Sequence, residues 1–431
     1  ASYVIPWHPV ASHGIPWNSP VLRAAEPTLS SNGLARCSGV VSLLAVGVAS
    51  GWRRRRGPLC AVRDCEPLLE WLKEMPATEG LDGLRIGQST YEAGGLGVFA
   101  AKDFAAGELV CRVPTEALLI SDTKAEDAAE TLAQQYLQER CRSSSRFSAY
   151  WQSLPQDEDL APLHPFQWPK DLQCPEYVTQ LLKGSLSARL VFDARLGQVA
   201  PITSSEMLKA LALVDSRSFN ITDENGEVLR ALVPFIDLFN TFVPLASSDN
   251  CTWNCWFRGT LQGGATLHTE CAITAGTELV HCYGDFSSAE FWATYGFLPS
   301  ETMESPHEAP VISLPLECSS LAPSVKLQLE KMLKPRHWLD EDTLIFEIPW
   351  DIEEDGLLYP TLELMASGAE DATLRQRLEV ALESNHAAEQ DLLQPPAGPH
   401  RHFQVKLQHA AVQLLRNERP LLEDELARVA G

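Results

Sequence analysis

ALVPFIDLFNTF (residues 231–242) and CAITAGTELVHCYGDFSSAEFWATYGFLPS (residues 271–300) are the two stretches of this 431-residue sequence that decide its fold. In the first stretch, apolar residues alternate as in a part-buried strand and lead to Asp237 and Asn240. In the second, residues 274–277 form a predicted turn, and an apolar run from Glu278 to Tyr283 indicates another strand. The sequence therefore predicts two short strands whose ends carry polar and aromatic side chains.

Four pieces of these stretches follow one another in a defined order. They are Pro234-Phe-Ile-Asp237-Leu-Phe-Asn240-Thr241, Ile273-Thr-Ala-Gly276-Thr-Glu278, Tyr283-Gly284 and Tyr295-Gly296-Phe297. In order and spacing they resemble the catalytic half of SET-domain protein lysine methyltransferases, in particular the plant Rubisco large-subunit methyltransferase-like type. The family has a histidine after the asparagine, and this chain has Thr241 at that position.

The resemblance implies an α+β fold, in which a SET domain of small twisted sheets with knot-like threading is followed by a C-terminal all-α substrate-binding domain. We predict three segments: a targeting segment at 1–62, the SET domain at 63–305 with a helical insert at about 122–200, and the helical Rubisco-methyltransferase-like domain at 306–431. Helical periodicity supports the last segment at 316–333, 361–393 and 403–429.

Local patterns predict the elements of the SET segment. We expect helices at 66–75, 125–140 and 207–219, strands at 98–100 and 109–113 joined by a turn at 106–107, and a hairpin turn at 224–226. Three aromatic residues of the insert, Trp151, Trp168 and Tyr177, are expected in the core rather than on a ligand.

The resemblance also implies where S-adenosyl-L-methionine and a substrate lysine would bind. The implied cofactor-binding residues are Gly95, Leu96, Gly97, Arg217, Asp237, Asn240, Thr241, Tyr283, Tyr295 and Phe297. The implied lysine channel consists of Ser216, Arg217, Phe219, Asp237 and Tyr283, and Tyr283 is the expected catalytic residue. Asp237 has two readings, a wall of the cofactor pocket or a carboxylate satisfied by backbone amides. The acid that the family often carries directly before its glycine loop stands two residues earlier here, at Glu92.

Methyl transfer from a sulfonium to an amine fits this residue set. The reaction is an in-line displacement, so the protein has to position a neutral amine and stabilise charge on the transferring methyl. It needs no nucleophilic triad and no acid–base pair. A tyrosine hydroxyl and carbonyl oxygens around the methyl would supply the required partial negative charge.

The charge of the chain indicates which kind of molecule it binds. The formal net charge is -23, and residues 1–62 carry six Arg against one Glu, so the rest of the chain carries -28. An acidic body repels phosphate, which argues against nucleic acid and favours a basic protein surface. We expect a monomer that acts on a protein presenting a lysine.

Cysteine usage argues against both a disulfide framework and a metal site. The eleven cysteines are scattered and odd in number. Cys251, Cys255, Cys271 and Cys282 lack the compact pairs typical of structural zinc, so we expect free thiols and no metal.

The first 62 residues have the composition of an organelle-targeting segment. They are rich in Ser, Pro, Gly and Arg and nearly free of acids. The apolar run at 40–49 is shorter than the roughly 20 residues that cross a bilayer, so no membrane span is expected. A disordered extension is the alternative. By analogy with the family we expect the plastid, with the mitochondrion or cytosol as alternatives.

Two other functions remain open at this stage. A catalytically silent SET-like module that binds a partner would account for Thr241 and the displaced Glu92, whereas Tyr283, Asn240 and Arg217 favour an enzyme. A methyltransferase acting on histidine would need the same cofactor site.

Overall fold

The computed structural model describes residues 65–430 except 90–94, 122–127, 156–162, 200–201, 203, 242–252, 285, 299–307, 317–321, 353–355, 366–368 and 397–398. The predicted targeting segment, Glu92 and Cys251 lie outside the described residues. None of the helices in this described part is both long and apolar enough to cross a membrane.

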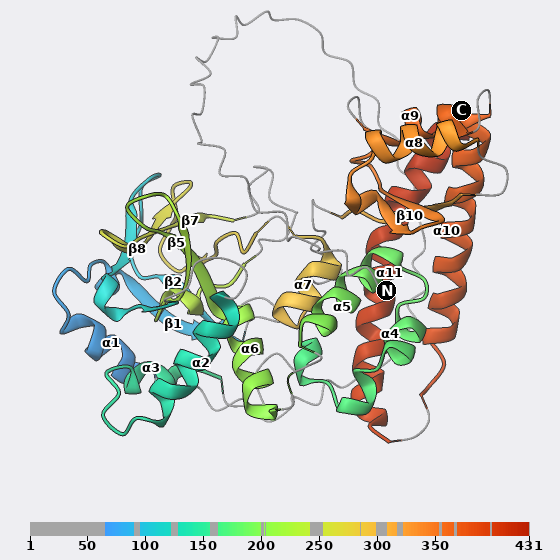
Figure 1. Cartoon of the computed structure of the whole chain (residues 1–431). Helices are drawn as coiled ribbons and strands as arrows, with labels where there is room; N and C mark the ends of the chain where they lie inside the picture. The colour runs from blue at the N-terminus through green and yellow to red at the C-terminus, as the bar shows by residue number, and fades with distance from the viewer. Residues whose placement is uncertain are drawn as a thin grey trace, which may run out of the picture. The chain divides into compact units, whose positions relative to one another are not determined.

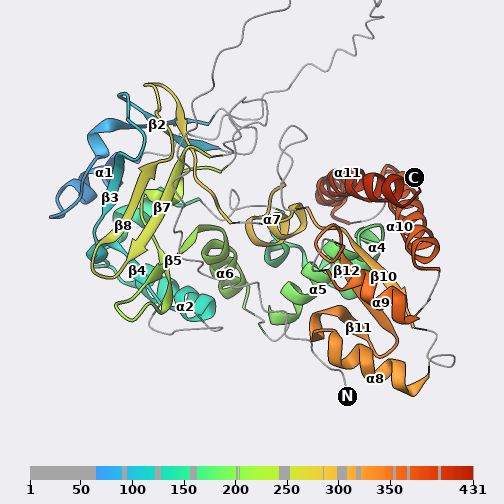
Figure 2. The same cartoon turned by 90° about the horizontal axis from the view of Figure 1, so that it is seen from above.

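A six-stranded sheet forms the larger part of the SET segment (Figures 1 and 2). Its order is β3 (Leu109–Val113), β8 (Gly264–Thr269), β7 (Cys255–Thr260), β5 (Ser218–Thr222), β6 (Val228–Leu232) and β4 (Leu119–Ile120). All pairs are antiparallel except β5 with β7. Ile221, Ala231 and Leu267 are fully buried on it, so the sheet forms one wall of the core.

A three-stranded antiparallel sheet holds the glycine-rich loop. Its order is β1 (Leu84–Gln88), β2 (Leu96–Ala100) and β9 (Glu278–Leu279). The strands predicted at 98–100 and 109–113 are present, and Gly107 takes φ 75° in the turn between them. They belong to different sheets, however, because β2 pairs with β1 while β3 pairs with β8.

The segment that follows β9 runs between two distant parts of the chain. Its Val280 forms a parallel bridge with Asn240, and its His281 forms one with Cys255. The backbone N–H groups of His281 and Cys255 donate to the carbonyls of Asn240 and Val280, both over 2.9 Å. The two quoted stretches therefore meet side by side at residues 280–281, which form the crossing segment.

Helices cover these sheets and form the insert. They are α1 (Glu66–Lys73), α2 (Ala128–Cys141), α3 (Ser148–Ser153), α4 (Pro175–Leu181), α5 (Leu186–Val199), α6 (Ser205–Arg217) and α7 (Ser288–Tyr295). Trp168 is buried as expected, whereas Trp151 is half-buried and packs on Tyr136 and Tyr150. Tyr177 on α4 is also half-buried.

Two elements differ from their predictions. The helix predicted at 207–219 ends at Arg217, because Ser218 and Phe219 pair with Leu232 and Ala231 as the start of β5. The strand predicted at 232–240 does not continue beyond Leu232, since Pro234 has no N–H for a ladder. A 3₁₀ turn, Ile236–Leu238, follows it, after Phe235 with a φ of 72°.

The C-terminal part is mainly helical, as expected. It contains α8 (Pro323–Met332), α9 (Leu358–Met365), α10 (Glu370–Leu392) and α11 (Arg401–Ala430), and the last two lie side by side in Figures 1 and 2. The expectation of an all-α segment needs one correction, a three-stranded sheet of β10 (Val311–Pro315), β12 (Thr343–Glu347) and β11 (Trp338–Asp340). Alternate residues of β10 and β12 are buried, as is typical of strands. The prediction of an all-α segment did not take this two-residue periodicity into account.

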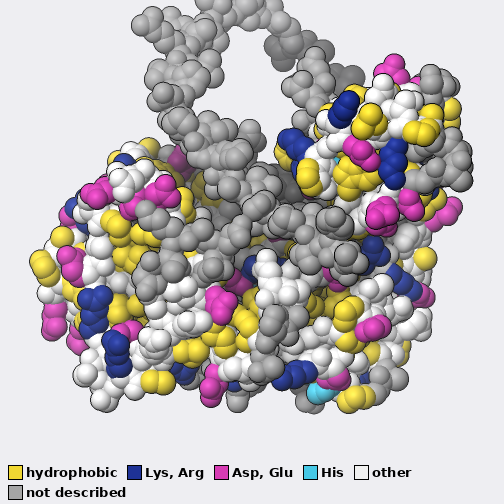
Figure 3. Space-filling model, in the orientation of Figure 1, with side chains coloured by type: hydrophobic (Ala, Val, Ile, Leu, Met, Phe, Trp, Pro, Cys, Tyr) yellow, Lys and Arg dark blue, Asp and Glu magenta, His cyan; other side chains and the backbone are white. Residues whose placement is uncertain are grey.

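Polar side chains join α11 to the SET segment. Glu418 of α11 is buried and accepts hydrogen bonds from Ser185, over 2.7 Å, and from Ser187, both at the start of α5. Asn417 donates to the Ser288 hydroxyl at the start of α7 over 2.9 Å. On the face drawn in Figure 3, the described Lys and Arg side chains lie scattered among Asp and Glu.

Replacing Glu418 with Gln should flatten the dependence of stability on pH. Burial raises the pKa of the Glu418 carboxyl from 4.5 to about 8. The folded chain therefore keeps a proton that the unfolded chain has released, so the free energy of unfolding falls as pH rises between these values. Urea unfolding at several pH values should show a smaller fall for Glu418→Gln. Exposed Glu423→Gln on the same helix is the control, and parallel curves for Glu418→Gln and wild type would contradict the assignment.

Candidate active site

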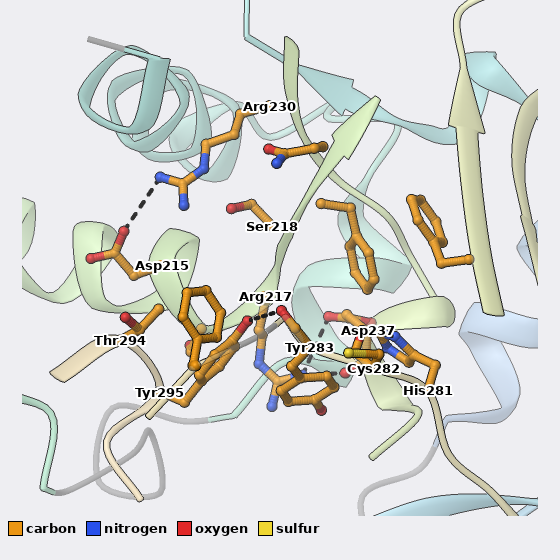
Figure 4. A pocket seen from close by; sticks show the side chains of 15 residues that line it. Asp215, Arg217, Ser218, Arg230, Asp237, His281, Cys282, Tyr283, Thr294 and Tyr295 are labelled. Atoms are coloured by element: carbon orange, nitrogen blue, oxygen red, sulfur yellow. Dashed lines mark hydrogen bonds and ion pairs between the residues drawn. The ribbon is translucent and has the colours of Figure 1, made fainter. Parts of the chain in front are cut away.

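A cavity of about 220 Å³ opens where the crossing segment meets the α6–β5 junction and α7 (Figure 4). It brings together six of the residues expected from the sequence: Ser216, Arg217, Phe219, Asp237, Tyr283 and Tyr295. These residues come from four separate parts of the chain. Every predicted lysine-channel residue therefore lines one cavity.

The change from helix to strand at Arg217 places its side chain over the 3₁₀ turn. Its guanidinium donates to the Asp237 carbonyl over 2.9 Å and to the Asp237 carboxylate over 3.3 Å. Tyr150 of α3 donates to the same carboxylate oxygen over 2.9 Å. Arg217 thus ties the α6–β5 junction to the turn that follows β6.

Asp237 is a buried carboxylate held by side chains. Burial raises its pKa, whereas Arg217 and the Tyr150 hydrogen bond act in the opposite direction. The Asp237 carboxylate lines the cavity, and its own backbone N–H also acts to lower its pKa. Its Oδ1 has no hydrogen-bond partner among the described residues.

Two tyrosines lie against each other at the cavity. Tyr283 donates its hydroxyl hydrogen to the carbonyl of Phe239 over 2.8 Å, and Tyr295 donates to the carbonyl of Tyr283 over 3.0 Å. Their ring centroids are 4.8 Å apart, and Phe297 packs on the ring of Tyr295. Desolvation raises the pKa of both hydroxyls, so both stay protonated at neutral pH. Their oxygen lone pairs remain available to a ligand.

The glycine loop meets Asn240. The Asn240 amide donates to the Leu96 carbonyl over 3.0 Å and to the Glu278 carboxylate over 2.9 Å. Gly97 has no room for a side chain, because a Cβ there would lie 2.2 Å from the Glu278 carboxylate. Gly95 takes φ 58°, and Thr241 is buried next to Asn240 in sequence. Gly95, Leu96, Gly97, Asn240 and Thr241 therefore lie together at the glycine loop, whereas Phe297 packs on Tyr295.

Sequence reasoning missed several residues of this site. Glu278 was read only as part of a motif, although it contacts both Asn240 and Ser89. Asp215 and Arg230 line the cavity as an ion pair of 3.5 Å, and His281 lines it beside Tyr283. Tyr150 lies far from Asp237 in the chain, and no sequence signal links the two. His281, by contrast, stands inside the quoted stretch.

Four polar atoms of the cavity-lining residues are buried without a hydrogen-bond partner among the described residues. They are Arg217 Nε, Ser218 Oγ, Asp237 Oδ1 and His281 Nε2. Buried polar groups are normally paired, so such a group of atoms marks a place where a ligand would supply partners.

A metal site finds no support among the described residues, where no group of three or more His, Cys, Asp or Glu side chains is placed to hold an ion. Cys255, Cys271 and Cys282 are free thiols. Cys251 lies outside the described residues, so the absence of metal stays a prediction.

Comparison with known proteins agrees with this geometry. The family model described as the SET domain matches residues 95–284. No curated protein sequence matches the chain.

Solved structures resemble the chain over most of its length. The SET domain of LSMT bound to lysine and AdoHcy is similar with a TM-score of 0.53 and 17% identity, over 85% of this chain and 92% of that one. Rubisco LSMT bound to AdoMet has a TM-score of 0.52 and 16% identity over 85% and 92% of the two chains. Rubisco LSMT bound to sinefungin and monomethyllysine has a TM-score of 0.52 and 19% identity over 87% and 92%. Residues 95–284 thus match the SET domain, and the chain shares the fold of Rubisco LSMT over about 85% of its length.

Proposed function

We propose that this protein transfers a methyl group from S-adenosyl-L-methionine to a lysine side chain of a protein substrate. The observation that carries the proposal is the position of Asn240. Its side chain contacts the glycine loop, while its carbonyl accepts from His281 in the crossing segment that leads to Tyr283. A cofactor at the loop and an amine in the cavity would be neighbours. The similar structures bind AdoMet, AdoHcy, lysine or monomethyllysine, which supports the same pair of ligands here.

The residues at the loop fit the amino-acid end of such a cofactor. Gly95 and Gly97 let the main chain approach a ligand closely, and Asn240 offers an amide beside the Leu96 carbonyl. When bound, the cofactor supplies an electrophilic methyl on a sulfonium. Glu278 orients Asn240 through its hydrogen bond, and Gly97 leaves room for that contact.

The cavity would position the amine and exclude water. Aromatic rings from Phe219, Phe257 and Tyr295 wall it, and a surrounding of this kind lowers the pKa of a lysine and favours the neutral amine. The hydroxyl hydrogens of Tyr283 and Tyr295 are already donated to carbonyls, so their oxygens present lone pairs. These lone pairs can stabilise the positive charge on a transferring methyl.

The charge of the chain supports a basic partner, because residues beyond 62 carry a net charge of -28. We further propose a monomer that works in the plastid, with residues 1–62 as the targeting segment. This location rests on the composition of that segment and on analogy with the family.

Asn240→Ala should weaken cofactor binding. The variant removes the amide that bonds the Leu96 carbonyl and Glu278, and it leaves buried polar groups of the site without partners. We expect affinity for S-adenosyl-L-methionine to fall about tenfold to a hundredfold, measured by calorimetry. Asn225→Ala in the exposed hairpin turn is the matched control. A wild-type protein that binds no cofactor would end the enzyme proposal and favour a silent protein-binding module.

Tyr283→Phe should lower turnover while leaving the cofactor affinity nearly unchanged. The variant removes one oxygen and keeps the ring packing on Tyr295 and His281. We expect a loss of roughly a hundredfold, about 2.7 kcal/mol, in single-turnover methyl transfer to a library of lysine-containing peptides. Tyr295→Phe is assayed beside it. Full activity of a stably folded Tyr283→Phe protein would remove Tyr283 from the mechanism, and a loss in Tyr295→Phe alone would assign the role to Tyr295.

A fluorescent protein fused behind residues 1–62 should enter plastids. The expected physical cause is the basic, acid-poor composition of the segment, which import machinery recognises. Microscopy of plant cells measures the outcome, and a fusion with Arg53–Arg56 changed to Ser is the comparison. Diffuse cytosolic fluorescence of the unchanged fusion would contradict the plastid proposal, and mitochondrial fluorescence would support the alternative organelle.

A further inference from the structure

His281 is a buried histidine in the wall of the cavity. Its side chain is 3% exposed, and its ring centroid lies 5.5 Å from that of Phe219 and 5.0 Å from that of Tyr283. Its backbone is fixed by the hydrogen bond from its N–H to the Asn240 carbonyl. The ring is therefore held by both the crossing segment and the aromatic wall.

The hydrogen bond at Nδ1 determines which nitrogen carries the proton. Nδ1 lies 2.9 Å from the carbonyl oxygen of Cys282. A carbonyl can only accept, so Nδ1 is the donor and carries the hydrogen. Burial lowers the pKa of His281 to about 4, so the ring is neutral at physiological pH. Nε2 then presents a lone pair, and it has no partner among the described residues.

The surrounding groups leave Nε2 in need of a donor. The two nearby tyrosine hydrogens are taken up by the carbonyls of Phe239 and Tyr283. Phe219 and Phe257 offer only apolar surface, and the unpaired donors of the lining, Arg217 Nε and Ser218 Oγ, make no hydrogen bond to Nε2. A ligand that satisfies Nε2 therefore has to bring an N–H or O–H group into the cavity, and the amine of a substrate lysine brings one.

We propose that Nε2 of His281 accepts a hydrogen bond from the nitrogen of the target lysine and thereby limits how many methyl groups that nitrogen receives. The inference rests on the proposed function. Each transfer forms an N–C bond and breaks the S–C bond, whose electron pair stays on sulfur, and the new ammonium then loses a proton to water. A neutral amine keeps an N–H after no methylation or one, and loses its last N–H after two. The contact therefore assists the first two transfers and not the third.

His281 acts in this scheme by orienting the amine, and it is not the base. A lysine ammonium has an ordinary pKa of about 10.4, so transfer of its proton to a group with a pKa of about 4 is unfavourable by roughly a millionfold. A hydrogen bond from the amine to Nε2 instead directs the nitrogen lone pair away from His281.

Binding of a series of methylated lysines distinguishes a hydrogen bond to His281 Nε2 from a role of the His281 ring in packing alone. Protein saturated with S-adenosylhomocysteine is titrated by calorimetry with free lysine and its mono-, di- and trimethyl forms. In water the side-chain ammonium of each of the first three carries an N–H, and the quaternary side-chain nitrogen of trimethyllysine carries none. We expect His281→Leu to weaken binding of the first three by about fivefold to tenfold and to leave trimethyllysine unchanged. Phe257→Leu, a packing control, should affect all four alike.

Equal losses for all four ligands in His281→Leu would overturn the proposal, since a purely structural histidine behaves that way. His281→Gln keeps an acceptor and should restore part of the selectivity. Mass spectrometry of the products gives a second measurement: the wild type should stop at dimethyllysine, and His281→Leu should form mono- and dimethyllysine more slowly without forming trimethyllysine faster. If His281→Leu does not fold, a wild type that forms trimethyllysine as fast as the lower products overturns the proposal.

Failure of the proposed function gives a different result. A wild-type protein that binds S-adenosylhomocysteine but none of the four lysines contradicts the lysine acceptor itself. A wild-type protein that does not bind S-adenosylhomocysteine contradicts the cofactor. If the wild type binds S-adenosylhomocysteine and the lysines, and His281→Leu weakens all four lysines equally, the result counts against the role of His281 alone.

Discussion

The whole site depends on the backbone hydrogen bonds that hold residues 280–281 between Asn240 and Cys255. These bonds join two stretches that are about forty residues apart, so closing the intervening loop costs conformational entropy. The cost is offset by burial of Val280, Phe239 and Leu279, which are all fully buried. Without this crossing, Asn240 and Tyr283 would not share a site.

Electrostatic interactions of Asp237 also stabilise the site. Asp237 is a buried carboxylate, and a buried charge is costly unless it is paired and hydrogen-bonded. Arg217 and Tyr150 supply those partners from α6 and α3. The pair therefore fixes the 3₁₀ turn relative to the helices, and it holds the Phe239 carbonyl where Tyr283 can donate to it.

The position of the site also depends on the C-terminal part, through the hydrogen bond between α11 and the start of α7. Asn417 and Glu308 both bond the Ser288 hydroxyl at the first residue of α7, and Tyr295 stands at the other end of that helix. A capping box of Ser287 and Glu290 stabilises the helix between them. The cavity is thus anchored to residues well outside the SET segment.

The sequence by itself predicted the SET fold, because four short pieces resemble the SET family in order and spacing. The resemblance also named six of the fifteen residues that line the cavity: Ser216, Arg217, Phe219, Asp237, Tyr283 and Tyr295. Local signals placed the β5–β6 hairpin correctly, since Gly226 takes φ 80° in its turn. Each of these signals is read from residues close together in the chain.

Only the tertiary structure decided the rest. The partners of Asp237, the contact of Asn240 with Glu278 and the state of His281 all depend on side chains from different elements. The helix ended early at Arg217 because pairing of Ser218 and Phe219 in the sheet outweighed local periodicity. Burial and long-range hydrogen bonds, which no window of sequence contains, fixed these outcomes.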